Sequence, residues 1–158
     1  MNEAVPLVDR EVRTTRMLSY PREVIFHALT DPEVLQRWWG PKGFTNTFHT
    51  FDLKPEGQWE FTMHGPNGEE FHNTCVFKRI EAPVYFEFDH VKEMHFYTAI
   101  FALMKVGEGT RLDWIMRFGT AAELYPIRTF IAQANEENID RLEAELDLLE
   151  HHDRTQEQ

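Results

Sequence analysis

Residues 20–43, YPREVIFHALTDPEVLQRWWGPKG, carry the signals of two short helices and decide the fold. Pro21 stands where the first turn of a helix tolerates a proline, because that N–H has no intrahelical partner. Residues 30–32, Thr-Asp-Pro, restart the chain with a capping side chain followed by a second proline at a first helical position. Gly40-Pro41 and Gly43 end the second helix. The segment therefore predicts two consecutive short helices.

The paired tryptophans Trp38 and Trp39 close this segment. Large aromatic side chains are usually buried, so the pair is expected to lie against the interior. Two interpretations remain open. The tryptophans plug one end of a hydrophobic core, or at least one of them borders a ligand cavity.

Residues 45–119 show the period-2 alternation of half-buried strands, separated by short turn signals. Residues 65–68, Gly-Pro-Asn-Gly, form one hairpin signal, and residues 107–109, Gly-Glu-Gly, form another. Strands joined by such short turns pair antiparallel, because parallel strands need long crossovers. The alternation places three sets of side chains on one face: Trp59, Phe61 and Met63; Phe71, Asn73, Cys75 and Phe77; and Leu112, Trp114, Met116 and Phe118.

Residues 121–150 predict a long amphipathic helix. Pro126 either starts this helix or kinks it. An apolar stripe of this length must cover another element, and a curved antiparallel sheet is the available partner. The stripe consists of Ile127, Ile131, Ala134, Asn138, Leu142, Leu146 and Leu149, and the opposite face carries Glu136, Asp140, Glu143, Asp147 and Glu150.

This order of elements resembles the START-like (SRPBCC) superfamily, and within it the family of the activator of heat shock protein 90 ATPase, the AHSA-like proteins. The resemblance implies an α+β helix-grip fold, also known from the birch pollen allergen. In that fold a curved seven-stranded antiparallel sheet wraps around a long C-terminal helix, with two short helices after the first strand. It implies a cavity between sheet and helix but fixes no chemistry. The residues that carry it are 20–26, 30–32, 38–41, 57–59, 65–68 and 109–112.

Length and composition predict one domain over residues 1–158, with a core of about 10–150, a flexible arm at 1–9 and a flexible acidic tail at 151–158. The sequence has no apolar run long enough for a membrane span and no signal-peptide pattern. Its single cysteine, Cys75, cannot form an internal disulfide, which fits a cytoplasmic protein. Cys75 lies mid-strand among aromatic residues, so we expect a buried, unreactive thiol.

The formal net charge of −11 argues against nucleic acid as a partner, because phosphate binding needs a basic surface. Much of the acidity falls in the last thirty residues. Two interpretations stay open for that region: a solvated helix face, or a surface that docks to a basic partner.

Aromatic residues make up 13% of the chain, with 13 Phe and 4 Trp. Such a composition is typical either of a pocket for an apolar ligand or of an aromatic core that holds none. Asn73 and Asn138 fall on apolar faces, where a buried amide must find partners. Each either sets strand or helix register or orients a ligand. The predicted ligand-binding residues are Trp38, Trp39, Trp59, Phe61, Asn73, Phe77, Phe88, Trp114, Met116 and Asn138.

The sequence carries no nucleophile motif, no phosphate-binding glycine loop and no zinc-binding spacing, so we predict no catalytic residue, no metal and no cofactor. His64, His72, Asp89 and His90 are conceivable as an acid/base or metal group. The alternative is that these histidines face solvent on the polar side of their strands, as the alternation around His64 and His72 suggests.

Three functional hypotheses follow. The first is a protein that binds a small hydrophobic molecule between sheet and helix. The second is a cyclase-like or hydrolase-like enzyme that uses the same cavity. The third is a chaperone-regulating or stress-response interaction module. A homodimer is compatible with each of them.

Overall fold

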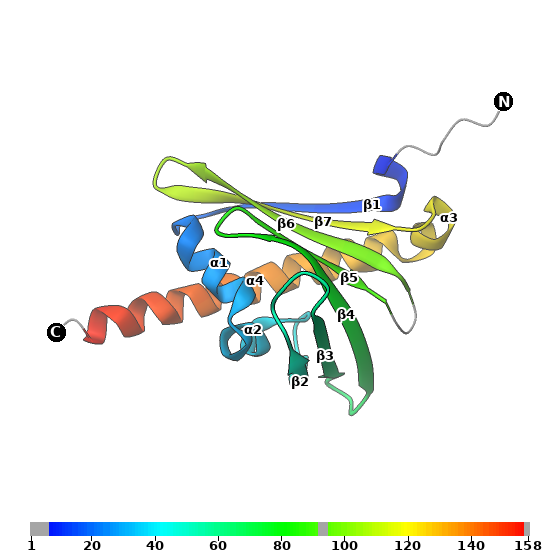
Figure 1. Ribbon diagram of the computed structural model, residues 1–158, viewed down its shortest axis with the longest axis horizontal. Helices are drawn as coiled ribbons and strands as arrows, with labels where there is room; N and C mark the ends of the chain where they lie inside the picture. Colours follow the sequence, from blue (N-terminus) through cyan, green and yellow to red (C-terminus); the bar gives the residue numbers. More distant parts are fainter. Residues whose placement is uncertain (1–6, 92–94, 157–158) are drawn as a thin grey trace.

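The computed structural model describes residues 7–91 and 95–156. One strand is followed by two short helices, six further strands and a long C-terminal helix, as the sequence predicts (Figure 1). The elements are η1 (Leu7–Arg10), β1 (Glu11–Leu18), α1 (Arg22–Thr30), α2 (Pro32–Trp38), β2 (Thr45–Phe51), β3 (Gln58–His64), β4 (Glu70–Glu81), β5 (Tyr85–His90), β6 (Tyr97–Val106), β7 (Gly109–Phe118), α3 (Ala121–Leu124), η2 (Tyr125–Ile127) and α4 (Arg128–Gln156).

The seven strands form one antiparallel sheet in the order β1-β7-β6-β5-β4-β3-β2. Every hairpin pairs neighbouring strands, and only β1 joins the sheet from far away in sequence, beside β7. The register shifts between Phe48 and Thr50 and again between Phe77 and Ile80, and irregularities of this kind increase the bend of a strand. The sheet curves strongly, and α4 runs across its concave side (Figure 1).

The helix starts follow the capping signals in the sequence. The Asp31 side chain accepts a hydrogen bond from the backbone N–H of Glu33 at 2.9 Å, and Pro32 is the first residue of α2. Thr120 caps α3 in the same way through the N–H of Glu123. Pro126 lies in the short 3₁₀ helix before α4, so it precedes the long helix and does not kink it.

The core lies between the concave face of the sheet and helices α1, α2 and α4. Each predicted inward set faces this core, although Phe71, at the end of β4, is 39% exposed. On α4 the buried stripe includes Asn135 and Ile139 in addition to the predicted Asn138, Leu142 and Leu146.

Parts of the arm and tail that we predicted to be flexible belong to regular elements. The backbone of residues 7–10 forms η1, and α4 continues through residue 156. Residues 1–6 and 157–158 lie outside the described residues, as do residues 92–94.

Candidate ligand-binding interior

Aromatic rings fill the space between the concave face of the sheet and α4. The ring of Trp39 lies among them, with its centroid 5.5 Å from that of Trp59 and 5.6 Å from that of Trp114. The rings of Phe88 and Phe101 are 6.1 and 6.2 Å away. Contacts of this geometry stabilise an apolar interior beyond the burial of area alone.

Two hydrogen-bond donors in this interior lack an acceptor. The indole Nε1 atoms of Trp59 and Trp114 are fully buried and have no hydrogen-bond partner among the described residues. Almost all buried polar groups in folded proteins are paired, so each exception calls for a physical explanation. The two indole rings that carry these donors both contact the ring of Trp39.

The neighbouring Trp38 is held differently. Its Nε1 donates a hydrogen bond of 3.0 Å to the carbonyl of Ala28 in α1. Its ring meets that of Trp39 edge-on at 5.8 Å. Trp38 therefore joins the two short helices to each other, whereas Trp39 points among the rings on the sheet.

Asn138 of α4 holds the backbone that carries both tryptophans. Its Oδ1 accepts a hydrogen bond from the N–H of Gly40 at 3.1 Å, and its Nδ2 donates to the carbonyl of Trp38 at 2.9 Å. Gly40 has φ of +99°, a conformation that favours glycine. Both ends of the Asn138 amide are thus engaged by the turn after α2.

Arg141, one helical turn further along α4, caps the same turn. Its guanidinium donates to four backbone carbonyls at 2.8–3.2 Å, and a cation at the C-terminus of a helix is favourable. Burial lowers the pKa of Arg141. The four carbonyls belong to Arg37, Trp39, Gly40 and Pro41.

A polar group lies on the inner face at the ends of β4 and β5. Nε2 of His90 is 2.8 Å from Oδ1 of Asn73, and Nδ1 of His90 is 2.8 Å from the carbonyl oxygen of His95. The His90 ring stacks on Tyr97 at 4.8 Å, and burial raises the pKa of Tyr97. The expectation that His90 faces solvent was therefore wrong: it is 5% exposed and shares a face with Phe88.

The other strand histidines lie on the outer face of the sheet, as expected. The hydroxyl of Thr62 is 2.9 Å from His49 Nε2 and 2.9 Å from His72 Nδ1, and His64 Nε2 is 2.8 Å from the Thr47 hydroxyl. These contacts tie β2, β3 and β4 together. Over residues 7–91 and 95–156, no group of three or more His, Cys, Asp or Glu side chains is placed to hold a metal ion.

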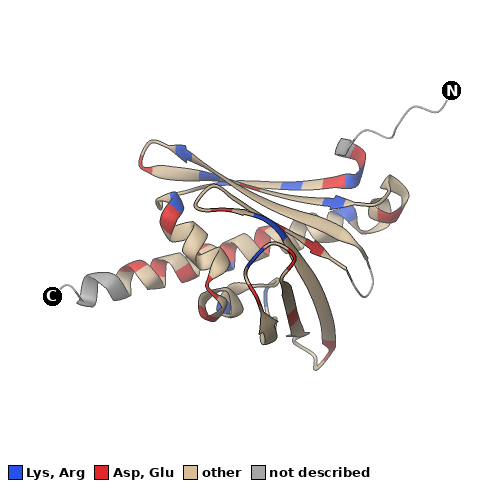
Figure 2. Cartoon of the chain, in the orientation of Figure 1, with Lys and Arg blue, Asp and Glu red and all other residues tan. Residues whose placement is uncertain are grey.

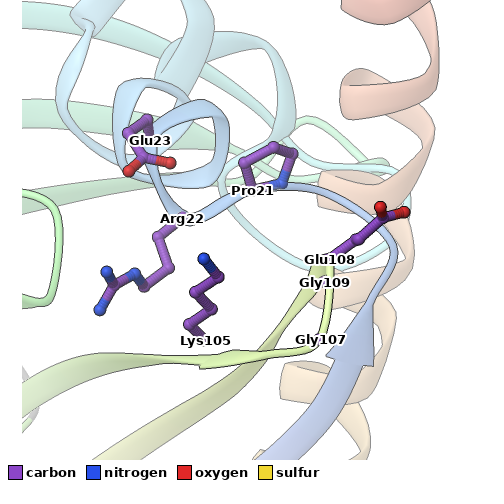
Figure 3. Close-up of a pocket in the computed structure, with 7 residues that line it drawn as sticks. All are labelled: Pro21, Arg22, Glu23, Lys105, Gly107, Glu108 and Gly109. Carbon is purple, nitrogen blue, oxygen red and sulfur yellow. The ribbon is translucent and has the colours of Figure 1, made fainter.

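A separate surface pocket of about 300 Å³ lies where α1 begins, beside the β6–β7 turn (Figure 3). The guanidinium of Arg22 and the amino group of Lys105 lie close together, while the carboxylate of Glu108 points away from them (Figure 3). None of the predicted ligand-binding residues lines this pocket. Its lining consists of Pro21, Arg22, Glu23, Lys105, Gly107, Glu108 and Gly109.

Cys75 is fully buried on the inner face of β4, beside Trp59 of β3 and His90 of β5. Burial, with a smaller contribution from the charge of Asp89, raises the pKa of its thiol well above the usual value. The prediction of a buried thiol is confirmed, and its high pKa makes it unreactive.

Comparison with known proteins identifies the family. The model of the family described as "Activator of Hsp90 ATPase homolog 1-like protein" matches residues 19–147. The chain belongs to this family. The AHSA-like resemblance and the helix-grip fold predicted from the sequence are both confirmed.

Solved structures of similar fold include a protein of Arthrobacter aurescens with a TM-score of 0.82 and 23% identity, covering 91% of this chain and 90% of that one. A protein of Nitrosomonas europaea gives a TM-score of 0.80 at 21% identity, covering 89% and 96%. The AHSA1 protein of Silicibacter pomeroyi gives 0.73 at 20% identity, covering 87% and 98%. At these identities the likeness establishes the fold alone. No curated protein matches the chain.

None of the helices in the described part of the chain is long and apolar enough to span a membrane.

The fold of this AHSA1-like protein brings most of the predicted ligand-binding residues together between the sheet and α4 and places the others outside this group. Asn73 lies at the edge of the gathered set, half-buried, where its Nδ2 donates to the carbonyl of Phe71 at 2.9 Å. Trp38 and Asn138 belong to the contact between α2 and α4. The gathered residues are Trp39, Trp59, Phe61, Phe77, Phe88, Trp114 and Met116.

Sequence reasoning missed three polar residues of α4 that shape this region. Asn135 is buried, and its Nδ2 lies 3.3 Å from the sulfur of Met116. Glu145 is buried and accepts a hydrogen bond of 2.6 Å from Arg37. The third is Arg141. The available signal was spacing, because Asn138, Arg141 and Glu145 recur at intervals of three and four along one side of the helix.

Proposed function

We propose that this protein binds a small, largely apolar molecule between the inner face of the sheet and α4. The observation that carries the proposal is the pair of buried indole N–H groups, on Trp59 and Trp114, that have no acceptor among the described residues. A buried donor left unpaired costs about 1–3 kcal/mol. A bound molecule that brings an oxygen atom would recover part of this free energy.

The surroundings define the chemical class. The rings of Trp59, Phe88 and Trp114 offer flat apolar surface, and sites for small molecules are typically lined in this way with a few polar groups that fix orientation. The ring neighbours of the two indoles are aromatic and uncharged, which favours an apolar ligand over a strongly ionic one. The proposed ligand is therefore a hydrophobic molecule with at least one hydrogen-bond acceptor.

Thermal unfolding, followed by tryptophan fluorescence, tests the proposal across fatty acids, flavonoids, sterols and polyketide-like aromatics. A ligand that binds only the folded chain must raise the apparent Tm in a saturable way. The Ala99→Leu variant fills space on the inner face of β6, and Ala102→Leu adds the same bulk on the outer face of the same strand. We expect the Tm shift to disappear in A99L and to persist in A102L. A folded protein with no shift for any compound would contradict the proposal.

An enzymatic role has weaker support. His90 and Tyr97 are ionisable groups on the inner face, stacked at 4.8 Å. A general base must reach a substrate proton with a nitrogen that is available for it. Both ring nitrogens of His90 already lie 2.8 Å from oxygen atoms of Asn73 and His95.

A protein partner is a second candidate, favoured by exposed aromatic side chains. Tyr125 is 84% exposed and Phe130 is 72% exposed, both near the start of α4. Exposed apolar side chains that gather in one place often mark an interaction site. The family description names activation of the Hsp90 ATPase, so calorimetric titration with an Hsp90 chaperone is the direct test. Binding that Phe130→Ser abolishes and Leu148→Ser leaves intact would support it.

A further inference from the structure

We propose that the ligand enters by displacing the ring of Trp39, and that it is a flat molecule of about indole size carrying an oxygen acceptor. This inference rests on the proposed function. In the unliganded protein, the ring of Trp39 occupies the ligand position, and a ligand of this class takes the place of that ring.

The position of the Trp39 ring supports this assignment. Its four neighbours on the sheet, Trp59, Trp114, Phe88 and Phe101, are all aromatic and lie within 6.2 Å between centroids. A molecule that takes the place of this ring contacts both indoles whose N–H groups lack acceptors. An indole ring supplies no acceptor of its own, since its N–H is a donor only, so Trp39 fills the space without pairing the two donors.

The Trp39 side chain is held by packing alone. No hydrogen bond of its indole is found among the described residues, whereas the indole of Trp38 donates to the carbonyl of Ala28 at 3.0 Å. Displacing the Trp39 ring therefore breaks ring contacts but no hydrogen bond. Of the two adjacent tryptophans, Trp39 is the one whose ring contacts both indoles with unpaired donors and whose own indole has no hydrogen bond among the described residues.

The backbone beneath the ring is anchored independently of it. The carbonyl of Trp39 accepts hydrogen bonds from Asn46 at 2.7 Å and Arg141 at 3.2 Å, and Asn138 holds Gly40. In each of these bonds, the atom that belongs to Trp39 or Gly40 is a backbone atom. A rotation of the Trp39 side chain about its own bonds leaves every one of them in place. The ring can swing out while α2 and α4 stay packed.

The test uses 1-indanone and indane, two bicyclic probes of about indole size that differ in one carbonyl oxygen. Trp39→Leu removes the displaced ring and keeps an apolar side chain. When a binding-competent state no longer has to be created, the apparent affinity rises by the inverse of its former population. We expect 1-indanone to bind W39L at least about tenfold more tightly than wild type. We also expect it to bind W39L more tightly than indane does.

Two matched variants distinguish binding at the Trp39 position from binding in any cavity that a deleted ring leaves behind. Trp38→Leu deletes a ring of the same size one residue away and is expected to gain no affinity. The double variant Trp59→Phe/Trp114→Phe in the W39L background removes both donors, and the preference for 1-indanone over indane should disappear. Equal binding of the two probes by W39L, or an equal gain in W38L, would overturn the inference.

A second measurement does not depend on how well W39L folds. The wild-type chain labelled with 5-fluorotryptophan has four fluorine resonances, and Trp39→Phe assigns the one of Trp39. Saturation with a ligand from the thermal screen should move the Trp39 resonance to the position of a solvent-exposed indole. A ligand that binds while this resonance keeps its buried position would overturn the inference and leave the proposed function standing. Absence of binding by every compound and probe would overturn both.

Discussion

Helix α4 is attached to the rest of the molecule on two sides, and the two attachments differ in kind. Toward β1 the contacts are ion pairs between side chains: Arg16 meets Glu136, Asp140 and Glu143 at 2.7–2.8 Å. Figure 2 shows acidic residues recurring along α4 and basic residues on β1. Burial alone would lower the pKa of Arg16, but the hydrogen bonds that its guanidinium donates to the three carboxylates raise it on balance.

Toward α2 the contacts run from side chain to backbone. Asn138 and Arg141 bind the carbonyls and the N–H of the turn after α2, and Asn138 is 3% exposed. Exposed ion pairs contribute little each and weaken in salt, whereas a buried donor or acceptor left unpaired carries its full desolvation cost. The α2 side should therefore determine stability, and the β1 side should respond to ionic strength.

The largest effect is expected from Asn138→Leu. The change keeps the side-chain volume but leaves the N–H of Gly40 and the carbonyl of Trp38 buried without partners. We expect the free energy of unfolding to fall by about 2–4 kcal/mol. Urea denaturation measures it. Asn135→Leu, which removes only a contact to the weak acceptor of Met116, is the control, and an equal loss in both variants would contradict the argument.

Arg141→Met should come next. It removes a half-buried cation that serves four carbonyls at a helix end, and we expect a loss of about 1–3 kcal/mol. Because the bonds are to neutral carbonyls, the loss should be nearly the same at low salt and in 1 M NaCl. Amide hydrogen exchange should also quicken between residues 38 and 44. A loss that vanishes in salt would place this contact in the same class as the ion pairs of Arg16.

Arg16→Met should give a smaller and salt-dependent loss. A network of one arginine with three exposed carboxylates is expected to contribute about 1 kcal/mol at low ionic strength. At high salt the difference from wild type should approach zero, because the Debye length shrinks to about 3 Å at 1 M. Denaturation of R16M and R141M in parallel, at both salt concentrations, compares the two sides directly.

Alkaline pH should leave the difference in stability between R16M and R141M nearly unchanged, since the guanidinium groups of Arg16 and Arg141 stay protonated. Wild-type stability should nevertheless decline between about pH 10 and pH 12. Burial and a hydrogen bond to Glu87 raise the pKa of Tyr85 from 10 to about 12, so its contribution is complete below the unfolded pKa and is lost as pH rises through the folded one. Tyr85→Phe should flatten the decline in denaturation curves. An unchanged slope in Y85F would rule Tyr85 out as its source.

The sequence predicted much of the fold because the relevant signals are local. Period-2 alternation assigned the inward faces of β3, β4 and β7, and Asp31 and Pro32 located the start of α2. Such signals depend on residues within one turn or one hairpin, so the sequence alone carries them.

The candidate site was harder to predict, because the roles of its residues depend on contacts between segments about a hundred residues apart. Trp38 and Trp39 are identical in type and adjacent, yet the end of α2 sends one ring against α1 and the other against the sheet. Nothing in the sequence around Arg141 indicates its role, because the carbonyls that it caps belong to the last turn of α2 and the residues that follow it. No periodicity in either segment encodes that pairing.

The single cysteine allows transient opening of the sheet to be measured by its rate of alkylation. Cys75 is enclosed on the inner face of the sheet, and its thiol has a raised pKa, so a thiol reagent can modify it only while β4 is transiently exposed. The rate of alkylation under native conditions then counts opening events of the sheet. With one thiol in the chain, each modified molecule records one such event at a known position.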